Sequence, residues 1–381
     1  MLRLSTRSGQ FSSELSAAID HAGLIAPEVH QTVAEIIHAV RETGDQALLH
    51  YAEQFDDFKP PSIESLRVSP SEMAAACELI SRPVDEALRL AAERVGDYHQ
   101  RQLEALGQSW DFEDALGNVL GQRVQPMARV GVYAPGGKAC YPSTVLMTAI
   151  PAKVAGVASV ALAVPAKGGV MSPVLLAAAH YAGVDEIWIM GGAQAIAALA
   201  YGTETIPKVD KITGPGNAYV ASAKRRVVGQ VGIDMIAGPT DSLILADATA
   251  DPFIVATDLV GQAEHGYNSP VWLVTDDRAL AERVMELVPG LIDDLPELNR
   301  GNAEAAWRDY AEVIVCADRE EMAATSDDYA PEHLTVQAGD LDWWLDRLQC
   351  YGSLFLGEET TVAFGDKASG TNHVLPTSQS A

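Results

Sequence analysis

The chain has 381 residues, of which 48% are hydrophobic and 20% are charged, and its formal net charge is −26 at pH 7. This length predicts more than one hydrophobic core, and the composition is typical of a globular enzyme. The acidic excess argues against nucleic acid and anionic membranes as partners, because both need a basic surface. No segment resembles a signal peptide or a membrane span, and the four cysteines follow no metal or disulfide spacing. We therefore expect a cytoplasmic protein with reduced thiols.

The N-terminal part of the chain is rich in helical patterns. Apolar residues recur every three or four positions in 33–55 and in 84–106. Gly44 and Asp45 interrupt the first of these segments and predict a break between two helices. We expect a helical N-terminal region over residues 1–128 that packs on the lobe after it.

From residue 129 onward, expected strands alternate with expected helices. ARVGVYAPGG, SVALAVPA, EIWIMGGAQ and KITGPGN each predict a strand, and a second set runs through DSLILADAT, PVWLVTDD, AEVIVCAD and GSLFLG. Such alternation predicts βαβ units around parallel sheets. The expected fold class is α/β, with two doubly wound Rossmann-like lobes over residues 129–238 and 239–381.

Three glycine-rich turns follow expected strands of the first lobe: APGG, MGGAQ and TGPGN. Backbone N–H groups in such turns can approach an anion, and ligands of these folds bind at the carboxyl ends of the strands. None of the turns is a G-x-G-x-x-G fingerprint, so the motif alone does not establish a nucleotide. Three such turns at corresponding strand ends favour a cofactor or another anionic ligand.

The second lobe carries polar residues suited to metal binding and proton transfer. Gln262 and His265 are one helical turn apart at the exit of an expected helix, which fits either a metal site or a helix cap. With Asp366 they would give one nitrogen and two oxygen ligands, a set that suits zinc. Glu332 beside His333 suits a general base next to a second acid–base group. Spacing alone does not show that these segments meet in space, so it does not establish a metal site.

Several longer motifs then point to a known family. GVYAPGGKACYPSTVLMTAIPAKVAGV, GGAQAIAALAYGT, KITGPGNAYVASAKR, GIDMIAGPT, QAEH, APEHL and GTNHVLPT occur in order over residues 30–377. Together they resemble the histidinol dehydrogenase family. The resemblance implies zinc and two NAD molecules, which serve to oxidise a small primary alcohol through a bound aldehyde to a carboxylate. It also implies a homodimer.

The same resemblance assigns roles to individual residues. It implies zinc ligands at Gln262, His265 and Asp366, a general base at His333 and a water-activating carboxylate at Glu332. The positions that match NAD contacts are Tyr133, Gln194 and Asn217, and those that match substrate contacts are Thr240 and His373.

The sequence departs from the family pattern in three places. Family members continue beyond LPTSQSA with a helical tail that supplies a glutamate and a further zinc ligand, so we expect an incomplete zinc site if the natural protein ends where this sequence does. The family's AGPSE reads AGPTD, which shortens a carboxylate by one methylene at Asp241. QAEHG, GDKASGTNH and LDWWL resemble a homologous branch that oxidises 2,3-dihydroxypropane-1-sulfonate. Lys367 would offer that sulfonate a cation, and the alternative is a solvated surface lysine.

Three classes of function follow. The leading hypothesis is a zinc- and NAD-dependent alcohol-to-acid dehydrogenase that acts on 2,3-dihydroxypropane-1-sulfonate, with histidinol as the alternative substrate. The second is an inactive paralogue that keeps the fold. The third is a thiol-dependent aldehyde dehydrogenase with Cys140 as its nucleophile, although no base flanks Cys140 in the sequence.

Overall fold

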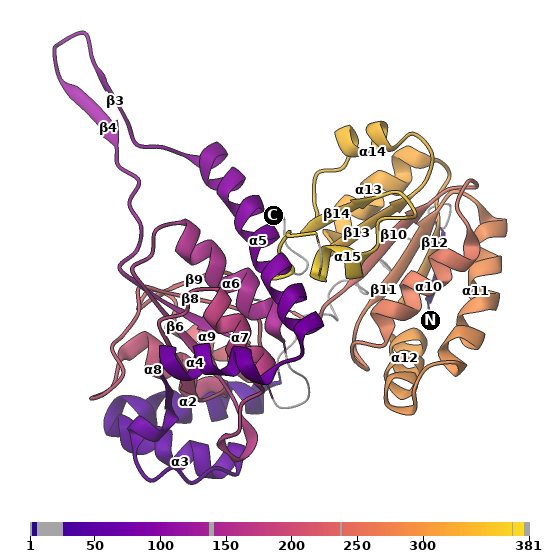
Figure 1. Ribbon diagram of the computed structural model, residues 1–381. Helices are drawn as coiled ribbons and strands as arrows, with labels where there is room; N and C mark the ends of the chain where they lie inside the picture. The colour runs from indigo at the N-terminus through magenta and orange to yellow at the C-terminus, as the bar shows by residue number, and fades with distance from the viewer. Residues whose placement is uncertain (1, 6–25, 137–140, 237, 368, 377–381) are drawn as a thin grey trace. The chain divides into compact units, whose positions relative to one another are not determined.

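The computed structural model describes residues 2–5, 26–136, 141–236, 238–367 and 369–376 (Figure 1). The chain divides into two compact units, each with its own sheet. Unit 1 comprises residues 1–24, 236–364 and 375–381, and unit 2 comprises residues 25–235 and 365–374. Cys140, the alternative nucleophile, lies outside the described residues. Nowhere in the described ranges is a helix both long enough and apolar enough to cross a membrane.

The sheet of unit 2 has the strand order β2-β7-β6-β5-β8-β9. Its strands are β2 (Arg67–Val68), β5 (Arg129–Tyr133), β6 (Ser159–Val164), β7 (Glu186–Ile189), β8 (Lys211–Thr213) and β9 (Gly232–Ile233). All neighbours are parallel except β2 and β7. From β5 the chain moves outward through β6 to β7 and then returns to β8 on the other side of β5. The strand order therefore reverses between β5 and β8, which is where ligands of α/β sheets bind.

Helices cover this sheet in two groups (Figure 1). The helices are α2 (Pro27–Thr43), α3 (Asp45–Asp56), α4 (Pro70–Ala76), α5 (Arg82–Leu106), α6 (Pro142–Val154), α7 (Pro173–Tyr181), α8 (Gly192–Tyr201) and α9 (Ala218–Val227), with 3-10 turns at Ile63–Leu66, Cys77–Leu79 and Lys167–Gly169. α2 and α3 pack with α8 and α9, whereas α4 and α5 pack with α6 and α7. The predicted break is confirmed, because Gly44 separates α2 from α3 with a φ of 49°.

A hairpin of β3 (Trp110–Glu113) and β4 (Val119–Gln122) follows α5, and the sequence did not predict it. The side chains of both strands are exposed. Neither strand therefore shows the alternation of buried and exposed residues by which a strand is recognised.

The sheet of unit 1 is parallel throughout, in the order β1-β12-β11-β10-β13-β14. Its strands are β1 (Leu2–Ser5), β10 (Ser242–Ala246), β11 (Val271–Thr275), β12 (Ala311–Val315), β13 (His333–Gln337) and β14 (Ser353–Leu356). The helices of unit 1 are α10 (Pro252–Ala263), α11 (Arg278–Asp293), α12 (Glu297–Asp309), α13 (Arg319–Tyr329), α14 (Leu341–Arg347) and the start of α15 (Val362–Lys367). β1 pairs with β12 far along the chain, a pairing that local sequence patterns do not reveal. The predicted α/β class with parallel sheets is confirmed.

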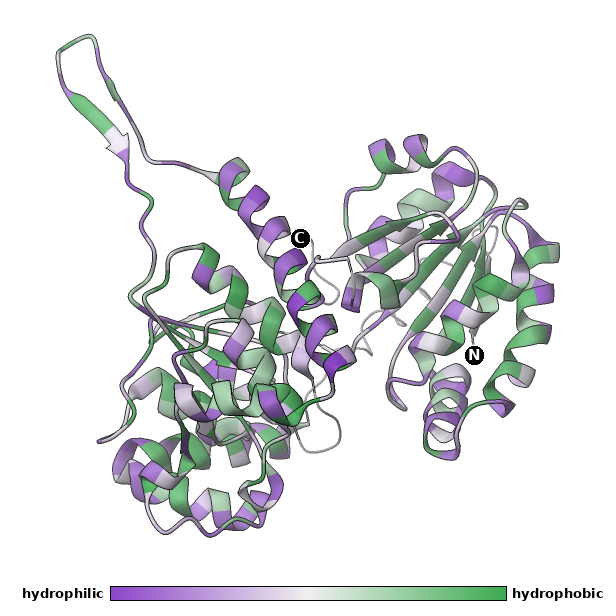
Figure 2. Ribbon diagram, in the orientation of Figure 1, coloured by the Kyte–Doolittle hydropathy of each residue, from purple (hydrophilic) through white to green (hydrophobic). Residues whose placement is uncertain are grey.

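The strands of both sheets are predominantly hydrophobic, whereas α5 is mainly hydrophilic (Figure 2). β6 and β10 read as continuous apolar runs because helices cover both of their faces. One core fills unit 2, and two clusters on the faces of the β10 sheet form the core of unit 1.

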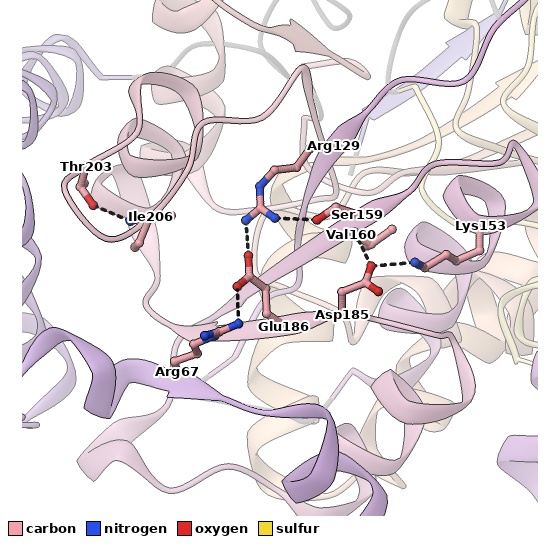
Figure 3. A network of polar contacts seen from close by, with 9 residues as sticks. All are labelled: Arg67, Arg129, Lys153, Ser159, Val160, Asp185, Glu186, Thr203 and Ile206. Atoms are coloured by element: carbon pink, nitrogen blue, oxygen red, sulfur yellow. Dashed lines mark hydrogen bonds and ion pairs between the residues drawn. The ribbon is translucent and has the colours of Figure 1, made fainter.

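The amino ends of the unit 2 strands are tied together by charged groups (Figure 3). Glu186 begins β7 and is 7% exposed, and it forms ion pairs with Arg129 at the start of β5 and with Arg67 at 3.3 Å. Arg129 also donates from Nη1 to Ser159 Oγ at 2.6 Å, which links it to β6. These contacts hold the amino ends of the strands together, and the glycine-rich turns lie at the carboxyl ends.

Candidate active site

The three residues expected to hold NAD all lie at the carboxyl edge of the unit 2 sheet. Tyr133 is the last residue of β5, Gln194 is in the first turn of α8 after β7, and Asn217 is the N-cap of α9 after β8. Tyr133 and Gln194 are 3% exposed, whereas Asn217 is exposed. The turns that carry Tyr133 and Asn217 flank the reversal between β5 and β8.

Tyr133 joins two of these turns. Its hydroxyl oxygen accepts a hydrogen bond from the backbone N–H of Gly192, the first residue of α8, at 3.2 Å. Burial raises the pKa of Tyr133 to about 12, so the phenol keeps its proton. The hydroxyl is therefore a hydrogen-bond donor held beside a helix N-terminus, where an anionic ligand is favoured.

Asn217 has a structural task of its own. Its Oδ1 accepts from the backbone N–H groups of Tyr219 at 3.0 Å and Val220 at 3.2 Å, which caps α9. The cap commits the side-chain oxygen and leaves the amide Nδ2 as the donor that a ligand could use.

The expected catalytic residues lie at the amino edge of the unit 1 sheet. His333 is the first residue of β13 and stands opposite Ser242, the first residue of β10, and Glu332 precedes it. Glu332 is 6% and His333 2% exposed. The expected catalytic residues of unit 1 thus lie at the opposite ends of the strands from the carboxyl ends, where ligands of such folds usually bind.

Asp241 organises this edge, and sequence reasoning had treated it only as a shortened carboxylate. Its Oδ1 accepts from the backbone N–H of Glu332 at 2.7 Å, and its backbone carbonyl accepts from Nδ1 of His333 at 3.0 Å. A carbonyl only accepts, so Nδ1 carries the hydrogen and Nε2 is the basic nitrogen of the neutral ring. The His333 ring lies 6.2 Å from that of Phe355, with 26° between the planes.

Asp241 is 1% exposed, and its burial raises the pKa of the carboxyl to about 7. The hydrogen bond from Glu332 and the charge of His333 oppose this rise. The site therefore contains a carboxyl that titrates close to neutral pH beside the expected base.

Gln262 and His265 lie at the end of α10 with their side chains already oriented. Gln262 is 4% exposed and donates from Nε2 to the carbonyl of Thr240 at 3.2 Å, which leaves Oε1 as its other polar end. His265 is exposed, and its Nδ1 lies 3.1 Å from the carbonyl of Gly261, which leaves Nε2 as the nitrogen that a ligand could use. The contact of His265 with the Gly261 carbonyl also caps the last turn of α10, so this geometry fits a helix cap and a metal ligand alike.

The remaining expected residues belong to unit 2. Asp366 is 9% exposed in the last turn of α15, and Nζ of the largely exposed Lys367 lies 3.9 Å from its Oδ2. Nε2 of His373 lies 3.5 Å from Oγ1 of Thr144. Asp366, Lys367 and His373 thus lie in unit 2, whereas His265 and His333 lie in unit 1.

Two cavities formed by described residues contain no expected site residue in their lining. One, of about 790 Å³, lies in unit 2 against α5 and α6 and includes Thr213 and Asp234. The other, of about 460 Å³, lies beyond the carboxyl ends of β13 and β14 in unit 1. Among the described residues, no group of three or more His, Cys, Asp or Glu is placed to hold a metal. The expected zinc set has only two residues of those types.

Comparisons with known proteins identify the class and then the family. The histidinol dehydrogenase family model matches residues 21–381. The sulfopropanediol 3-dehydrogenase of Ruegeria pomeroyi is 55% identical over 357 residues, which cover 93% of this chain and 81% of that protein. The histidinol dehydrogenase of Cereibacter sphaeroides is 48% identical over 378 residues, 99% of this chain and 86% of that protein.

A solved structure of a histidinol dehydrogenase also matches this chain. The crystal structure of histidinol dehydrogenase from Elizabethkingia anophelis matches with a TM-score of 0.89 at 35% identity, over 99% of this chain and 85% of that one. The protein is thus an NAD-dependent dehydrogenase that acts on a CH–OH group. It belongs to the histidinol dehydrogenase family, and the resemblance drawn from the motifs is confirmed.

Proposed function

We propose that the protein oxidises a small polar primary alcohol to the carboxylate in two steps, with zinc and NAD bound, and that 2,3-dihydroxypropane-1-sulfonate is its substrate. The observation that carries the chemistry is the buried His333, whose Nδ1 is fixed to the Asp241 carbonyl and whose Nε2 is thereby the basic atom. We further propose two doubly wound Rossmann-like lobes, with NAD on residues 129–238 and the metal and substrate on residues 239–381, in a homodimer.

Gln262 and His265, the two proposed ligands in unit 1, fit zinc. The hydrogen bond from His265 Nδ1 to a backbone carbonyl is the support that metal-bound histidines use to fix their tautomer. The contact of Gln262 Nε2 with Thr240 turns the amide so that its oxygen is the ligating end. With Asp366 as the third ligand, nitrogen and oxygen donors of this kind suit zinc. Bound zinc would polarise the substrate oxygen and orient the alcohol.

The carboxyl edge of unit 2 fits a dinucleotide. Its turns converge closely, since a Cβ at Gly191 would lie 2.5 Å from the Cβ of Pro165. The neutral Tyr133 hydroxyl, the α8 N-terminus and the Asn217 amide supply donors for an anionic ligand. Bound NAD would accept a hydride in each half-reaction.

Proton transfer is the task of His333 and Glu332. In the first half-reaction, Nε2 of His333 takes the hydroxyl proton as hydride leaves the carbinol carbon, which gives the aldehyde. In the second, Glu332 takes a proton from the attacking water. The hydrate then gives its hydroxyl proton to His333, and its carbon gives up a hydride for which a second NAD⁺ would be the acceptor. The sum is alcohol, water and two NAD⁺ to carboxylate, two NADH and three protons.

The substrate is proposed from the higher identity to the sulfopropanediol enzyme and from the basic residue beside Asp366. The Lys367 side chain is 63% exposed, so its ammonium is free to move toward an anionic substrate. Histidinol, whose amine and imidazole are basic, would gain nothing from this cation. Such a side chain discriminates through charge, by attraction of one substrate and repulsion of the other.

The test compares kcat/KM for NADH formation with the two alcohols on zinc-loaded protein. We expect turnover of the sulfonate to exceed that of histidinol by more than about a hundredfold, the discrimination that a well-placed charge can supply. Lys367→Glu should lower this ratio mainly through the KM of the sulfonate, while Lys208→Glu, at another exposed lysine, should not. Preference for histidinol would contradict the substrate proposal and support the alternative.

A further inference from the structure

Lys224 is a charged residue inside the unit 2 core. It lies on α9 between two exposed arginines and the buried Ala223, and it is 2% exposed. Val220 and Val227, one turn away on either side, are also buried, so Lys224 lies on the apolar face of the helix. A lysine at such a position is costly unless its ammonium is fully paired.

The ammonium of Lys224 is paired with the turn that carries Asn217. Its Nζ donates to the carbonyl of Gly214 at 3.0 Å and forms an ion pair with Asp234, which follows β9. Asp234 Oδ2 in turn accepts from the backbone N–H of Gly214 at 2.7 Å, and its Oδ1 accepts from the N–H of Met235 at 2.7 Å. Both peptide groups of Gly214 are therefore held by side chains from two different segments, the buried Lys224 of α9 and the largely buried Asp234 after β9.

Gly214 is also pressed against the end of β5. Its φ is 119°, and a Cβ at this position would fall well inside van der Waals contact with the carbonyl oxygen of Tyr133. Only glycine fits this conformation and this approach. Because Gly214 is fixed to Tyr133 on one side and to the Lys224–Asp234 pair on the other, the GPGN turn has one position relative to β5.

We propose that Lys224 and Asp234 are positioning residues for the dinucleotide. They hold the Gly214–Asn217 turn in its binding conformation in the absence of NAD. The distance between the Asn217 amide and the Tyr133 hydroxyl is thereby fixed before the cofactor binds. The proposal rests on the proposed function, because it takes the cofactor to bind at this edge. Lys224 is buried beneath the turn and acts on NAD only through Gly214. A preorganised turn binds more tightly because ordering it costs nothing at the moment of binding.

The test measures NAD⁺ affinity directly, by calorimetric titration of the zinc-loaded protein without an alcohol. Lys224→Met alone would leave Asp234 as an uncompensated buried carboxylate, so the informative variant is Lys224→Met with Asp234→Asn. We expect the Kd for NAD⁺ to rise about tenfold to a hundredfold, since a small misplacement of a binding group has effects of this size. Zinc content should stay unchanged, and kcat at saturating NAD⁺ should change by less than about threefold, within the size of a typical mutational effect. The matched control, Arg225→Met on the exposed face, should behave as wild type.

A second measurement on the wild-type protein avoids any folding defect of the variant. Hydrogen exchange of the peptide containing Gly214 should already be slow without NAD⁺, because the N–H is bonded to Asp234. A double variant that binds NAD⁺ with wild-type affinity, or rapid exchange at Gly214 that only NAD⁺ suppresses, would overturn the proposal. Wild-type protein that binds no NAD⁺ would overturn the proposed function and this inference with it.

Discussion

The backbone carbonyl of Asp241 accepts a hydrogen bond from Nδ1 of His333 at 3.0 Å. Asp241 directly precedes Ser242, the β10 residue that is paired with His333 at the start of β13. The side chain of the same residue holds the backbone N–H of Glu332. One buried aspartate thus fixes the ring of the expected base and the start of the segment that carries both catalytic candidates. This relationship lies inside unit 1 and needs no ligand to form.

Replacement of His333 by Asn should remove the basic nitrogen at a site where the fold already orients the ring. We expect kcat to fall by about a hundredfold to ten-thousandfold, the usual contribution of a general base. NAD⁺ affinity and zinc content should remain as in the wild type. The control is His180→Asn, at an exposed histidine on α7, which should keep full activity. A fully active His333→Asn protein would remove this residue from the mechanism.

Asp241 should make stability depend on pH in an unusual direction. Its pKa is about 7 in the folded protein and near 4 when unfolded, so the native state binds the extra proton between these values. Its contribution to stability is present below pH 4 and is lost as pH rises through 7, by at most about 1.4 kcal/mol per pH unit. The Tm of Asp241→Asn minus that of wild type should therefore increase from pH 5 to pH 8. A constant difference would contradict the raised pKa.

His265→Ala should abolish zinc binding without unfolding the chain, because this side chain is exposed at the end of α10. Metal analysis after zinc loading and desalting should find close to one equivalent in the wild type and little in the variant. His50→Ala, at an exposed histidine of α3, provides the matched control. Retention of a full equivalent by His265→Ala would show that the metal is held elsewhere.

The ion pairs of Glu186 at the amino ends of the unit 2 strands should affect stability alone. Glu186→Ala leaves Arg129 without its partner in a largely buried place, while Arg67 can turn to solvent. We expect a loss of about 2–3 kcal/mol in unfolding free energy, below the full value for a buried pair because Arg67 is half exposed. Glu186→Gln should cost less, since an amide still accepts one hydrogen bond. The Kd for NAD⁺ should not change in either variant, and a large change would contradict the separation of the two edges.

Local patterns were sufficient to predict much of the fold. The break at Gly44, the helix over 84–106 and the alternation of apolar strands with helices depend on neighbours in sequence, and all are present. The pairing of β1 with β12 depends on residues about three hundred positions apart, and no local pattern encodes it. The β3–β4 hairpin was missed for the opposite reason, because fully exposed strands carry no burial pattern.

The same contrast holds for the candidate site. Motifs indicated which side chains to consider, but not that His333, the expected base, would begin a strand instead of following one. They also gave no role to Asp241 or Lys224, whose partners lie in other segments of the chain: Glu332 for Asp241, and Gly214 and Asp234 for Lys224. A signal for Lys224 does exist in the sequence, since it shares a helical face with Val220 and Val227. A lysine in an apolar stripe requires a buried partner.

The number of NADH molecules formed per molecule of alcohol is the most direct test of the central claim, a four-electron oxidation by one enzyme. The measurement uses limiting 2,3-dihydroxypropane-1-sulfonate with excess NAD⁺ and zinc-loaded protein, with a carbonyl trap present to capture any released aldehyde. Two NADH per alcohol with no trapped aldehyde is the expected result, because the aldehyde stays bound while Glu332 activates water and His333 takes a second hydroxyl proton. One NADH per alcohol, with the aldehyde recovered in the trap, would contradict the account.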